Sequence, residues 1–382
     1  MDTAAHRVAV THAAGARGMS PALTVLGGTV ISLIGLTWDV QWHSDVGPDT
    51  FFTLPHLFLY SGSAISGIAS LVVVLAATAA QRAGQRHDPA IGGRAVRTLG
   101  VFAAPIGYLV SGVGAASFLA YGLWDLWWHG LYGFDAVINS PPHIGLLLSI
   151  SVTMVGAVMV FAAARDQRWG RVGTLCALSV LLAFSTVTVL GLQNLEGTVS
   201  WIDAGTGFVS VLILLVGAGC QAGLRASPQA GSAPGQHGRP GGALLIAVGL
   251  GVIQAVFWWF SPWAAHAYAD AVGLPVRDYV NGVPEMPSLM PMCLVAVALI
   301  IESLLAWGRS ARWTPAVVGA VGALIVAACA PFQSALLYGK HVSSTMSIVA
   351  TSVAGAVLGL LAGFLGWRFG RMLRLLSPAE GH

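Results

Sequence analysis

Charged residues are scarce in this sequence: Asp, Glu, Lys and Arg together make up only 9% of its 382 residues. Hydrophobic residues make up 56%, and the mean hydropathy is +0.77. Apolar runs of about 20 residues recur along the chain, and each is long enough to cross the ~30 Å hydrocarbon core of a bilayer as a helix. An ionised side chain at mid-membrane costs at least ~2.5 kcal/mol, which explains why so few are present. The sequence predicts an all-α polytopic membrane protein whose first partner is the lipid bilayer.

Cysteine and the common catalytic motifs are also scarce. The four cysteines fall within apolar runs and form no CxxC pair, so they predict neither a redox motif nor a zinc site, although a contact between Cys293 and Cys329 stays open. The sequence contains no GxxxxGK[ST] phosphate loop, no GxSxG elbow and no HExxH motif. ATP-driven transport and the common hydrolase mechanisms therefore have no support.

About ten membrane spans are expected from the apolar runs. They are predicted at residues 21–42, 56–80, 99–127, 143–164, 171–192, 204–224, 242–265, 288–307, 313–331 and 343–366. A Gly/Pro/Ser-rich stretch at 225–241 predicts a flexible linker between a six-span region (21–224) and a four-span region (242–366). Residues 1–20 and 367–382 are predicted to be tails. Because residues 1–20 lack the apolar core and cleavage site of a signal peptide, the first span is expected to remain in the mature protein.

Basic residues predict the orientation of the spans. Arginines gather in the predicted loops on one side, at Arg82, Arg86, Arg94, Arg97, Arg165, Arg168, Arg171, Arg225, Arg239, Arg309, Arg312, Arg368, Arg371 and Arg374. The opposite loops hold only Arg277 and Lys340, so the arginine-rich side and both termini are expected in the cytoplasm. The net charge of +3 is then a topology signal and gives no reason to expect a nucleic-acid partner. The preference for arginine over lysine suggests a GC-rich bacterial genome, and hence a bacterial plasma membrane.

One polar motif occurs twice at the predicted outer face. TWDVQWHSDVGPDTFFTLPHL covers residues 37–57, and LWDLWWHGLYGFDAVINSPPHI covers residues 123–144. In the first copy, Asp39 and His43 are spaced to share one face of a helix, near its outer end. His56 opens the next span after a short, turn-rich loop, so an antiparallel hairpin returns it to the level of His43. Two imidazoles and one carboxylate form a plausible ligand set for a divalent transition metal.

The second copy repeats this geometry. Asp125, His129 and His143 have nearly the same spacing as the first triad and predict a second metal site at the same face. Asp49 and Asp135 each follow the first histidine of their motif at equal spacing. They are expected to orient an imidazole from outside the ligand set. The sequence thus predicts two His2Asp sites near the extracytoplasmic face.

A non-functional interpretation accounts for some of the same residues. Tryptophans beside the motifs are typical of an interfacial aromatic belt, and a histidine there is often only hydrogen bonded. A degenerate third hairpin weakens this interpretation: Trp259, Trp263 and Asp270 keep the frame, while Phe260 and Ala264 stand in the Asp and His positions. The scaffold therefore does not require the ligands, and their presence in two copies favours a function.

Two further features leave alternatives open. Met286, Met290 and Met292 would offer soft thioether ligands to Cu(I), although methionine in a membrane helix usually serves packing. Glu302 lies in the inner half of the predicted eighth span, where a carboxylate is a functional candidate by default. An internal ion pair between Glu302 and Arg309 is the competing interpretation.

The pattern Asp-x3-His-x12-His at Asp39, His43 and His56 resembles that of a copper-binding membrane component of the copper membrane monooxygenases, the particulate methane and ammonia monooxygenase family. An Asn-x3-His-x13-His set supplies the neighbouring site of that component, and its spacing matches that of the second triad, with Asp125 in place of Asn. The resemblance is limited to the two hairpins. It implies two copper sites near the outer face, with further membrane subunits or electron donors as partners. Tandem hairpins of this kind also resemble a group of uncharacterised bacterial membrane proteins, which implies no function.

Three functional hypotheses follow from the sequence. The first is a copper protein, with zinc or iron as alternative metals, that is a copper-dependent oxidase or monooxygenase or a subunit of one. The second is a copper or zinc transporter or metal-delivery protein, which would need a polar path through spans that are poor in polar residues. The third is a non-catalytic assembly factor whose Trp/His belt docks a partner.

Overall fold

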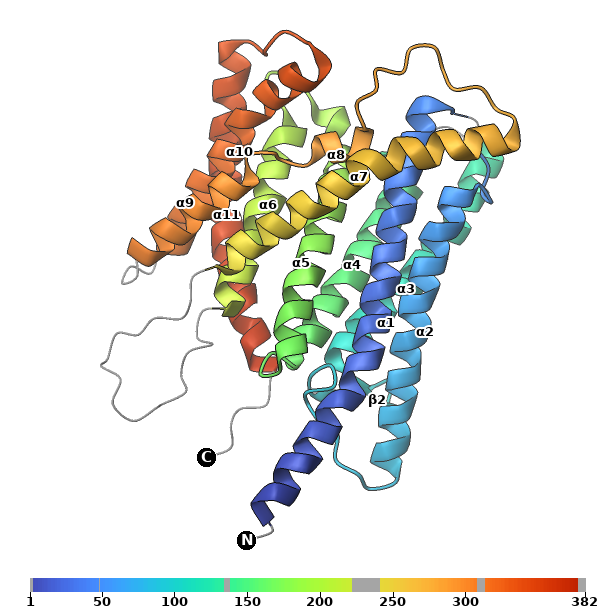
Figure 1. Cartoon of the computed structure of the whole chain (residues 1–382), viewed down its shortest axis with the longest axis vertical. Helices are drawn as coiled ribbons and strands as arrows, with labels where there is room; N and C mark the ends of the chain where they lie inside the picture. Colours follow the sequence, from blue (N-terminus) through green and yellow to red (C-terminus); the bar gives the residue numbers. More distant parts are fainter. Residues whose placement is uncertain (1–2, 48, 134–137, 222–240, 308–312, 377–382) are drawn as a thin grey trace.

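The computed structural model of the chain describes residues 3–47, 49–133, 138–221, 241–307 and 313–376, with side chains from Gly18 onward. Ten helical segments in these ranges are long and apolar enough to cross a membrane. The predicted all-α polytopic bundle is confirmed (Figure 1). The helices, the two short strands and the two 3-10 turns are α1 (Thr3–Asp45), α2 (Leu54–Arg82), β1 (Ala95–Thr98), β2 (Phe102–Pro105), α3 (Ile106–Tyr132), α4 (Pro141–Ala163), α5 (Arg168–Thr188), η1 (Val189–Leu195), α6 (Trp201–Gln221), α7 (Gly242–Val272), α8 (Glu285–Leu289), α9 (Leu294–Trp307), α10 (Thr314–Tyr338), α11 (Thr345–Leu373) and η2 (Arg374–Leu376).

The first and second tandem hairpins are α1 with α2 and α3 with α4, each packed closely through glycines. A Cβ atom at Gly28 of α1 would meet the backbone of Gly62 on α2, and one at Gly156 of α4 would meet the backbone of Ser111 on α3. Small residues at helix crossings let the backbones approach each other, which is a common way to pack helices in a membrane. This close packing fixes the register of the helix ends that carry the repeated polar motifs.

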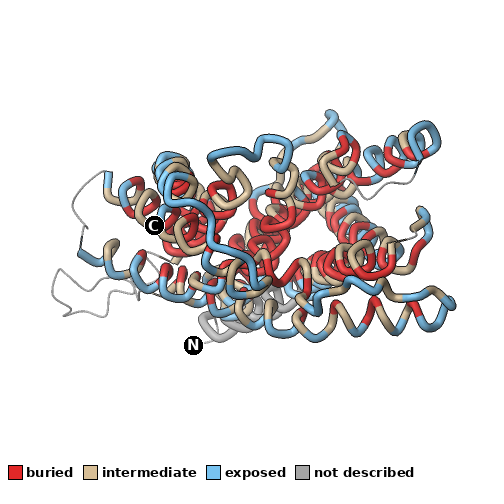
Figure 2. Tube along the Cα trace, turned by 90° about the horizontal axis from the view of Figure 1, so that it is seen from above, coloured by how far each residue is buried: buried red, intermediate tan, exposed pale blue. Residues whose placement is uncertain are grey.

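The centre of the bundle is formed by α4, α5 and α6. These helices are buried on most sides, as the red tube at the centre of Figure 2 shows. Phe161 of α4, Phe184 of α5 and Leu214 of α6 are fully buried there. Outer helices such as α2, α7 and α11 bury one face and leave many large apolar side chains exposed, as expected where lipid is the solvent.

The third span begins later than predicted. Residues 99–105, expected to be helical, instead belong to an antiparallel hairpin in which β1 pairs with β2. Leu99 and Gly100 make its turn with positive φ angles of 52° and 70°. The Thr78 hydroxyl of α2 accepts a 3.0 Å hydrogen bond from the backbone of Ala103. The positive φ angles cannot continue a helix, so α3 begins only after its N-cap residue, Pro105.

The eighth span is broken between α8 and α9. The chain is extended at Met290, with ψ near 128°, and Pro291 follows it. A proline disfavours the helical conformation for the residue before it. Gln254 of α7 donates to the carbonyls of Pro287 and Met290 at 2.9 and 3.1 Å, and Gln333 of α10 donates to Met290 at 3.0 Å. The Pro287 carbonyl also accepts from the backbone N–H of Met290 at 3.2 Å, so the amides complete the hydrogen bonding of the carbonyls at the break, where a membrane offers little water.

Met286 and Met290 are fully buried in the apolar core, whereas Met292 is 44% exposed. The burial of Met286 and Met290 agrees with the packing interpretation. Glu302 accepts a 2.8 Å hydrogen bond from the backbone N–H of Ala243, the second residue of α7. The carboxylate therefore stabilises a helix N-terminus, where unpaired N–H groups and the helix dipole favour negative charge.

Several predicted features lie outside the described residues. They are Asp135, Arg309, Arg312, all of the 225–241 linker except Gly241, the last three residues (222–224) of the predicted sixth span and residues 377–382 of the predicted C-terminal tail. The predicted tail at residues 1–20 is continuous with helix α1 from Thr3 onward. Cys293 and Cys329 do lie together, with their thiols in hydrogen-bond contact between α9 and α10.

Candidate metal centres

The first candidate centre is built where α1 ends and α2 begins. Helix α1 ends at Asp45, and Gly47, with a φ of 100°, turns the chain back. Helix α2 starts at Leu54 and Pro55, with Pro in the first turn, where the missing N–H costs nothing. His56 therefore lies at the start of α2, facing the last two turns of α1.

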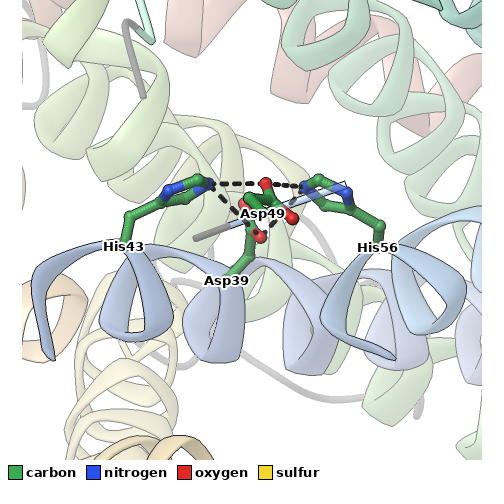
Figure 3. Close-up of side chains that lie close together, drawn as sticks. All are labelled: Asp39, His43, Asp49 and His56. Carbon is green, nitrogen blue, oxygen red and sulfur yellow. Dashed lines mark ion pairs between the residues drawn. The ribbon is translucent and has the colours of Figure 1, made fainter. Parts of the chain in front are cut away.

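Four side chains meet in this turn (Figure 3). They are Asp39, His43, Asp49 and His56, and one ligand atom from each lies within 4.8 Å of all the others. Oδ1 of Asp39 lies 3.0 Å from Nε2 of His56 and 3.8 Å from Nε2 of His43. Oδ2 of Asp49 lies 3.1 Å from Nε2 of His43 and 3.3 Å from Nε2 of His56. We call this set the first cluster.

Asp49 thus occupies a different place from the one predicted for it. Its spacing in the sequence suggested a residue that orients an imidazole from outside the ligand set, but its carboxylate faces the same two ring nitrogens as Asp39 does. Burial raises the pKa of Asp49, and this effect is outweighed by the hydrogen bond with His43, the charge of His56 and the hydroxyl of Thr53. The net pKa lies below its ordinary value, so Asp49 is a carboxylate at neutral pH.

The side chains of the first cluster are oriented for ligation. Nδ1 of His56 lies 3.0 Å from the backbone carbonyl of Thr50, which requires a proton on Nδ1 and leaves Nε2 directed into the cluster. Oδ1 of Asp39 is buried without a well-directed hydrogen bond from any described group. Buried polar atoms in proteins are rarely left in this state, and a metal ion between the carboxylates and imidazoles would satisfy it.

The second cluster consists of Asp125 and His129 on α3 and His143 on α4. Nε2 of each histidine lies 3.4 Å from Oδ1 of Asp125. Nδ1 of His129 lies 2.9 Å from the carbonyl of Gly133, and the Ser140 side chain caps α4 by accepting from the backbone N–H of His143. Oδ1 of Asp125 is also buried without a hydrogen bond from the described residues. The same combination of two imidazoles and a buried carboxylate oxygen without a directed hydrogen bond therefore recurs.

The two clusters are neighbours. Tyr60, one turn beyond His56 on α2, stacks on the His56 ring with 5.9 Å between ring centroids and lies within electrostatic range of Asp125. Asp125 in turn lies within electrostatic range of His56 and Asp49. Contact between α2 and α3 brings the two tandem hairpins together at this end of the bundle. A charge bound in one cluster would therefore affect the other.

The two clusters differ in charge. With neutral imidazoles, the two carboxylates of the first cluster carry two negative charges, and the described residues of the second cluster carry one, from Asp125. Uncompensated charge is costly in a poorly solvated site. A divalent cation would neutralise the first cluster completely. Among the described residues the first cluster thus has one carboxylate more than the second, and Asp135, the counterpart of Asp49 in the second motif, lies outside them.

A contact that no sequence pattern predicts supports the end of α1. Nε2 of His266 on α7 lies 2.7 Å from Oδ2 of Asp45, and Gln41 donates to Oδ1 of the same carboxylate at 3.0 Å. Arg277 donates from its backbone to the carbonyl of Asp45 at 2.8 Å and from its guanidinium to the carbonyl of His43 at 2.8 Å. Cations at a helix C-terminus stabilise its unpaired carbonyls. The degenerate third hairpin thus packs against the helix that carries Asp39 and His43.

The role of the third hairpin explains its altered residues. Phe260, at the position of the motif Asp, packs edge-on against Trp38 with 6.3 Å between ring centroids. Ala264, at the position of the motif His, is buried in the same contact. His266 precedes Asp270 by four residues, which is the motif spacing with the Asp and the His exchanged. No local sequence pattern links His266 to Asp45.

No protein-family model, curated protein or solved structure matches this chain. The resemblance to the copper membrane monooxygenases therefore remains a prediction from the motif residues.

Proposed function

We propose that this chain is an integral membrane metalloprotein with two neighbouring transition-metal sites, at least one of which binds copper. The proposal depends chiefly on one observation: in both clusters a buried carboxylate oxygen without a hydrogen bond faces two imidazole nitrogens. The ligands would be Asp39, His43, Asp49 and His56 in the first cluster and Asp125, His129 and His143 in the second. Imidazole and carboxylate ligands suit copper, zinc and iron, and the motif resemblance favours copper.

The first cluster matches a divalent ion in charge. Its two carboxylates balance the charge of Cu²⁺ or Zn²⁺, and its two histidines present Nε2. The described residues of the second cluster offer three ligands, two imidazoles and one carboxylate. Copper bound there would supply one-electron chemistry, and the task of the chain is to hold the ion and limit access to it. We therefore propose an oxidase or monooxygenase role, alone or as a subunit with membrane partners that deliver electrons.

Sidedness supports the same proposal. Both clusters lie at the end of the bundle where α1 ends and α2 begins. The described arginine-rich segments, between α2 and β1, between α4 and α5 and at the end of α11, lie at the other end (Figure 1). By the positive-inside rule, the clusters would face the extracytoplasmic side of a bacterial plasma membrane.

The transport alternative gains no support from Glu302. Transport would need polar groups along a path through the membrane. Glu302, the intramembrane carboxylate singled out in the sequence, is instead hydrogen bonded to the start of α7. The docking alternative predicts no metal at all, so metal content separates it from our proposal.

The decisive experiment is metal analysis of detergent-purified protein by mass spectrometry after reconstitution with copper or zinc. We expect wild type to bind more than one ion per chain, and His43→Ala and His129→Ala each to lose one class of site. His341→Ala is the matched control, because His341 is exposed and lies outside both clusters. Metal content that is negligible in wild type, or equal in all four proteins, would refute the proposal. If wild type instead bound zinc or iron and the variants lost it in the same pattern, the two metal sites would be supported and the assignment of copper would be refuted.

A further inference from the structure

Three arginines gather at the end of the bundle opposite the metal clusters. Arg165 lies in the turn between α4 and α5, and Arg371 and Arg374 lie where α11 ends. Arg374 is within electrostatic range of both Arg165 and Arg371, and η2, which begins at Arg374, contacts α4. Cys220, near the end of α6, is within electrostatic range of Arg165 and Arg374. The three positive charges therefore converge where α4, α6 and α11 end.

The Arg165 guanidinium has unused donors. Its Nε and Nη1 atoms are buried, yet neither has a hydrogen-bond partner among the described residues. A guanidinium is always charged and offers its donors in a planar fork. Burying two such donors without an acceptor is costly, and like charges nearby add to that cost. The carbonyls at the helix ends offset part of the repulsion, but they leave these two donors unpaired.

The surrounding turn holds Arg165 in place. Nη1 of Arg171 donates to the backbone carbonyls of Arg165 and Asp166, at 3.2 and 3.1 Å. The Asp166 side chain is exposed at the surface of the same turn. The backbone of Arg165 is thus fixed by a neighbouring arginine, while Nε and Nη1 of its own side chain have no acceptor among the described residues.

The depth of this site indicates the source of the acceptor. The span containing α4 ends at Ala163, the next begins at Arg168, and the last ends at Leu376. Arg165 and Arg374 therefore lie at the level where lipid headgroups meet the ends of membrane helices. Basic pockets between helix ends on the cytoplasmic side are suited to phosphate headgroups, and arginine binds phosphate in a bidentate manner.

We propose that the phosphate group of an acidic membrane phospholipid binds between the ends of α4 and α11, accepted by the Arg165 fork and by the charges of Arg371 and Arg374. The headgroup supplies the acceptors that Nε and Nη1 of Arg165 lack and offsets the repulsion among the three arginines. Such a lipid would hold the end of α11 against the turn between α4 and α5. This site is independent of the metal clusters, which lie at the opposite end of the bundle.

The test is thermal unfolding followed by tryptophan fluorescence, in uncharged detergent with added phosphatidylglycerol, phosphatidylcholine or inorganic phosphate. We expect phosphatidylglycerol to raise the melting temperature of wild type at ~0.15 M salt, and phosphatidylcholine to leave it unchanged. Arg165→Gln should weaken the apparent affinity for phosphatidylglycerol by about tenfold, because losing one charge-assisted hydrogen bond has an effect of about this size. Arg86→Gln is the matched control: it removes an exposed arginine from a loop at the same end of the bundle, and its affinity should stay within about twofold of wild type.

Arg374→Gln provides a second variant in case Arg165→Gln fails to fold, and it should weaken binding in the same direction. The proposal is overturned if phosphatidylglycerol does not stabilise wild type, or if Arg86→Gln loses as much affinity as Arg165→Gln. An equal effect of inorganic phosphate without acidic lipid would overturn the lipid as the source and assign the site to free phosphate.

Discussion

His266 and Asp45 form a contact of 2.7 Å between their side chains although 221 positions separate them in the sequence. The contact joins α7 to the last residue of α1, two turns from Asp39 and close to His43. The third hairpin, which lacks the Asp and His residues of the other two motifs, therefore supports the first cluster from outside. Its role in the fold is to position α1.

We expect His266→Ala to weaken metal binding at the first cluster by about 10- to 100-fold without abolishing it, as is usual when a group that supports a metal ligand is lost. The measurement is a metal titration of His266→Ala combined with His129→Ala, so that only the first cluster is intact. His129→Ala alone is the reference. An unchanged affinity would show that the contact with Asp45 does not support the site.

Asp49→Asn tests whether Asp49 is a ligand of the first cluster. Its carboxylate oxygen lies 3.1 Å from Nε2 of His43, so the change removes one of the two negative charges that face a bound ion. We expect divalent-ion affinity to fall by at least about 100-fold, more than the loss of a group outside the ligand set would cause. Asp278→Asn, which removes an exposed carboxylate from the loop after α7, is the control and should bind as wild type does. If Asp49→Asn bound the ion as tightly as wild type does, Asp49 would not be a ligand and would have the supporting role predicted from the sequence.

On acidification, we expect metal release to occur at a higher pH than unfolding. Metal binding requires neutral imidazoles, so we expect acidification to release the metal well before it protonates Asp49. Asp49 behaves differently because its pKa is lowered in the folded protein. Its stabilising effect is present above the pKa of the unfolded chain, near ~3.9, and is lost only as pH falls through the lower folded pKa. Metal retained after gel filtration and tryptophan melting, both measured from about pH 8 to 3, test this order. Unfolding that coincides with metal release would contradict it.

Adjacent glycines on α1 provide a test of the close helix packing. A Cβ atom at Gly28 would meet the backbone of Gly62 and Ser66 on α2, whereas one at Gly27 meets nothing within 4 Å. We expect Gly28→Ala to destabilise the protein by about 1–3 kcal/mol, because the hairpin must separate. It should also reduce metal affinity at the first cluster, which spans the two helices. Gly27→Ala should be neutral or slightly stabilising, since alanine favours the helix. Similar melting temperatures for the two variants would refute the close-packing argument.

Much of this architecture is determined locally and could be predicted. Hydropathy is a property of each segment, so the ten spans follow from runs of apolar residues. The two triads were predictable because a short loop must return His56 to α1 and His143 to α3, whatever the rest of the chain does. Where local signals conflict, the prediction failed: residues 99–105 are apolar, but the turn at Leu99 and Gly100 makes them a hairpin and delays α3.

Only the tertiary structure decided the remainder, because the relevant contacts join segments that no periodicity relates. The sequence alone determined an all-α membrane bundle and two Asp/His triads at one end of it. The fold placed Asp49 inside the first cluster, joined His266 to Asp45, and turned Glu302 into the cap of α7. Each of these outcomes depends on where a polar group in a nearly apolar bundle finds its partner. That choice is made by through-space packing, since a buried polar group is costly until it is paired.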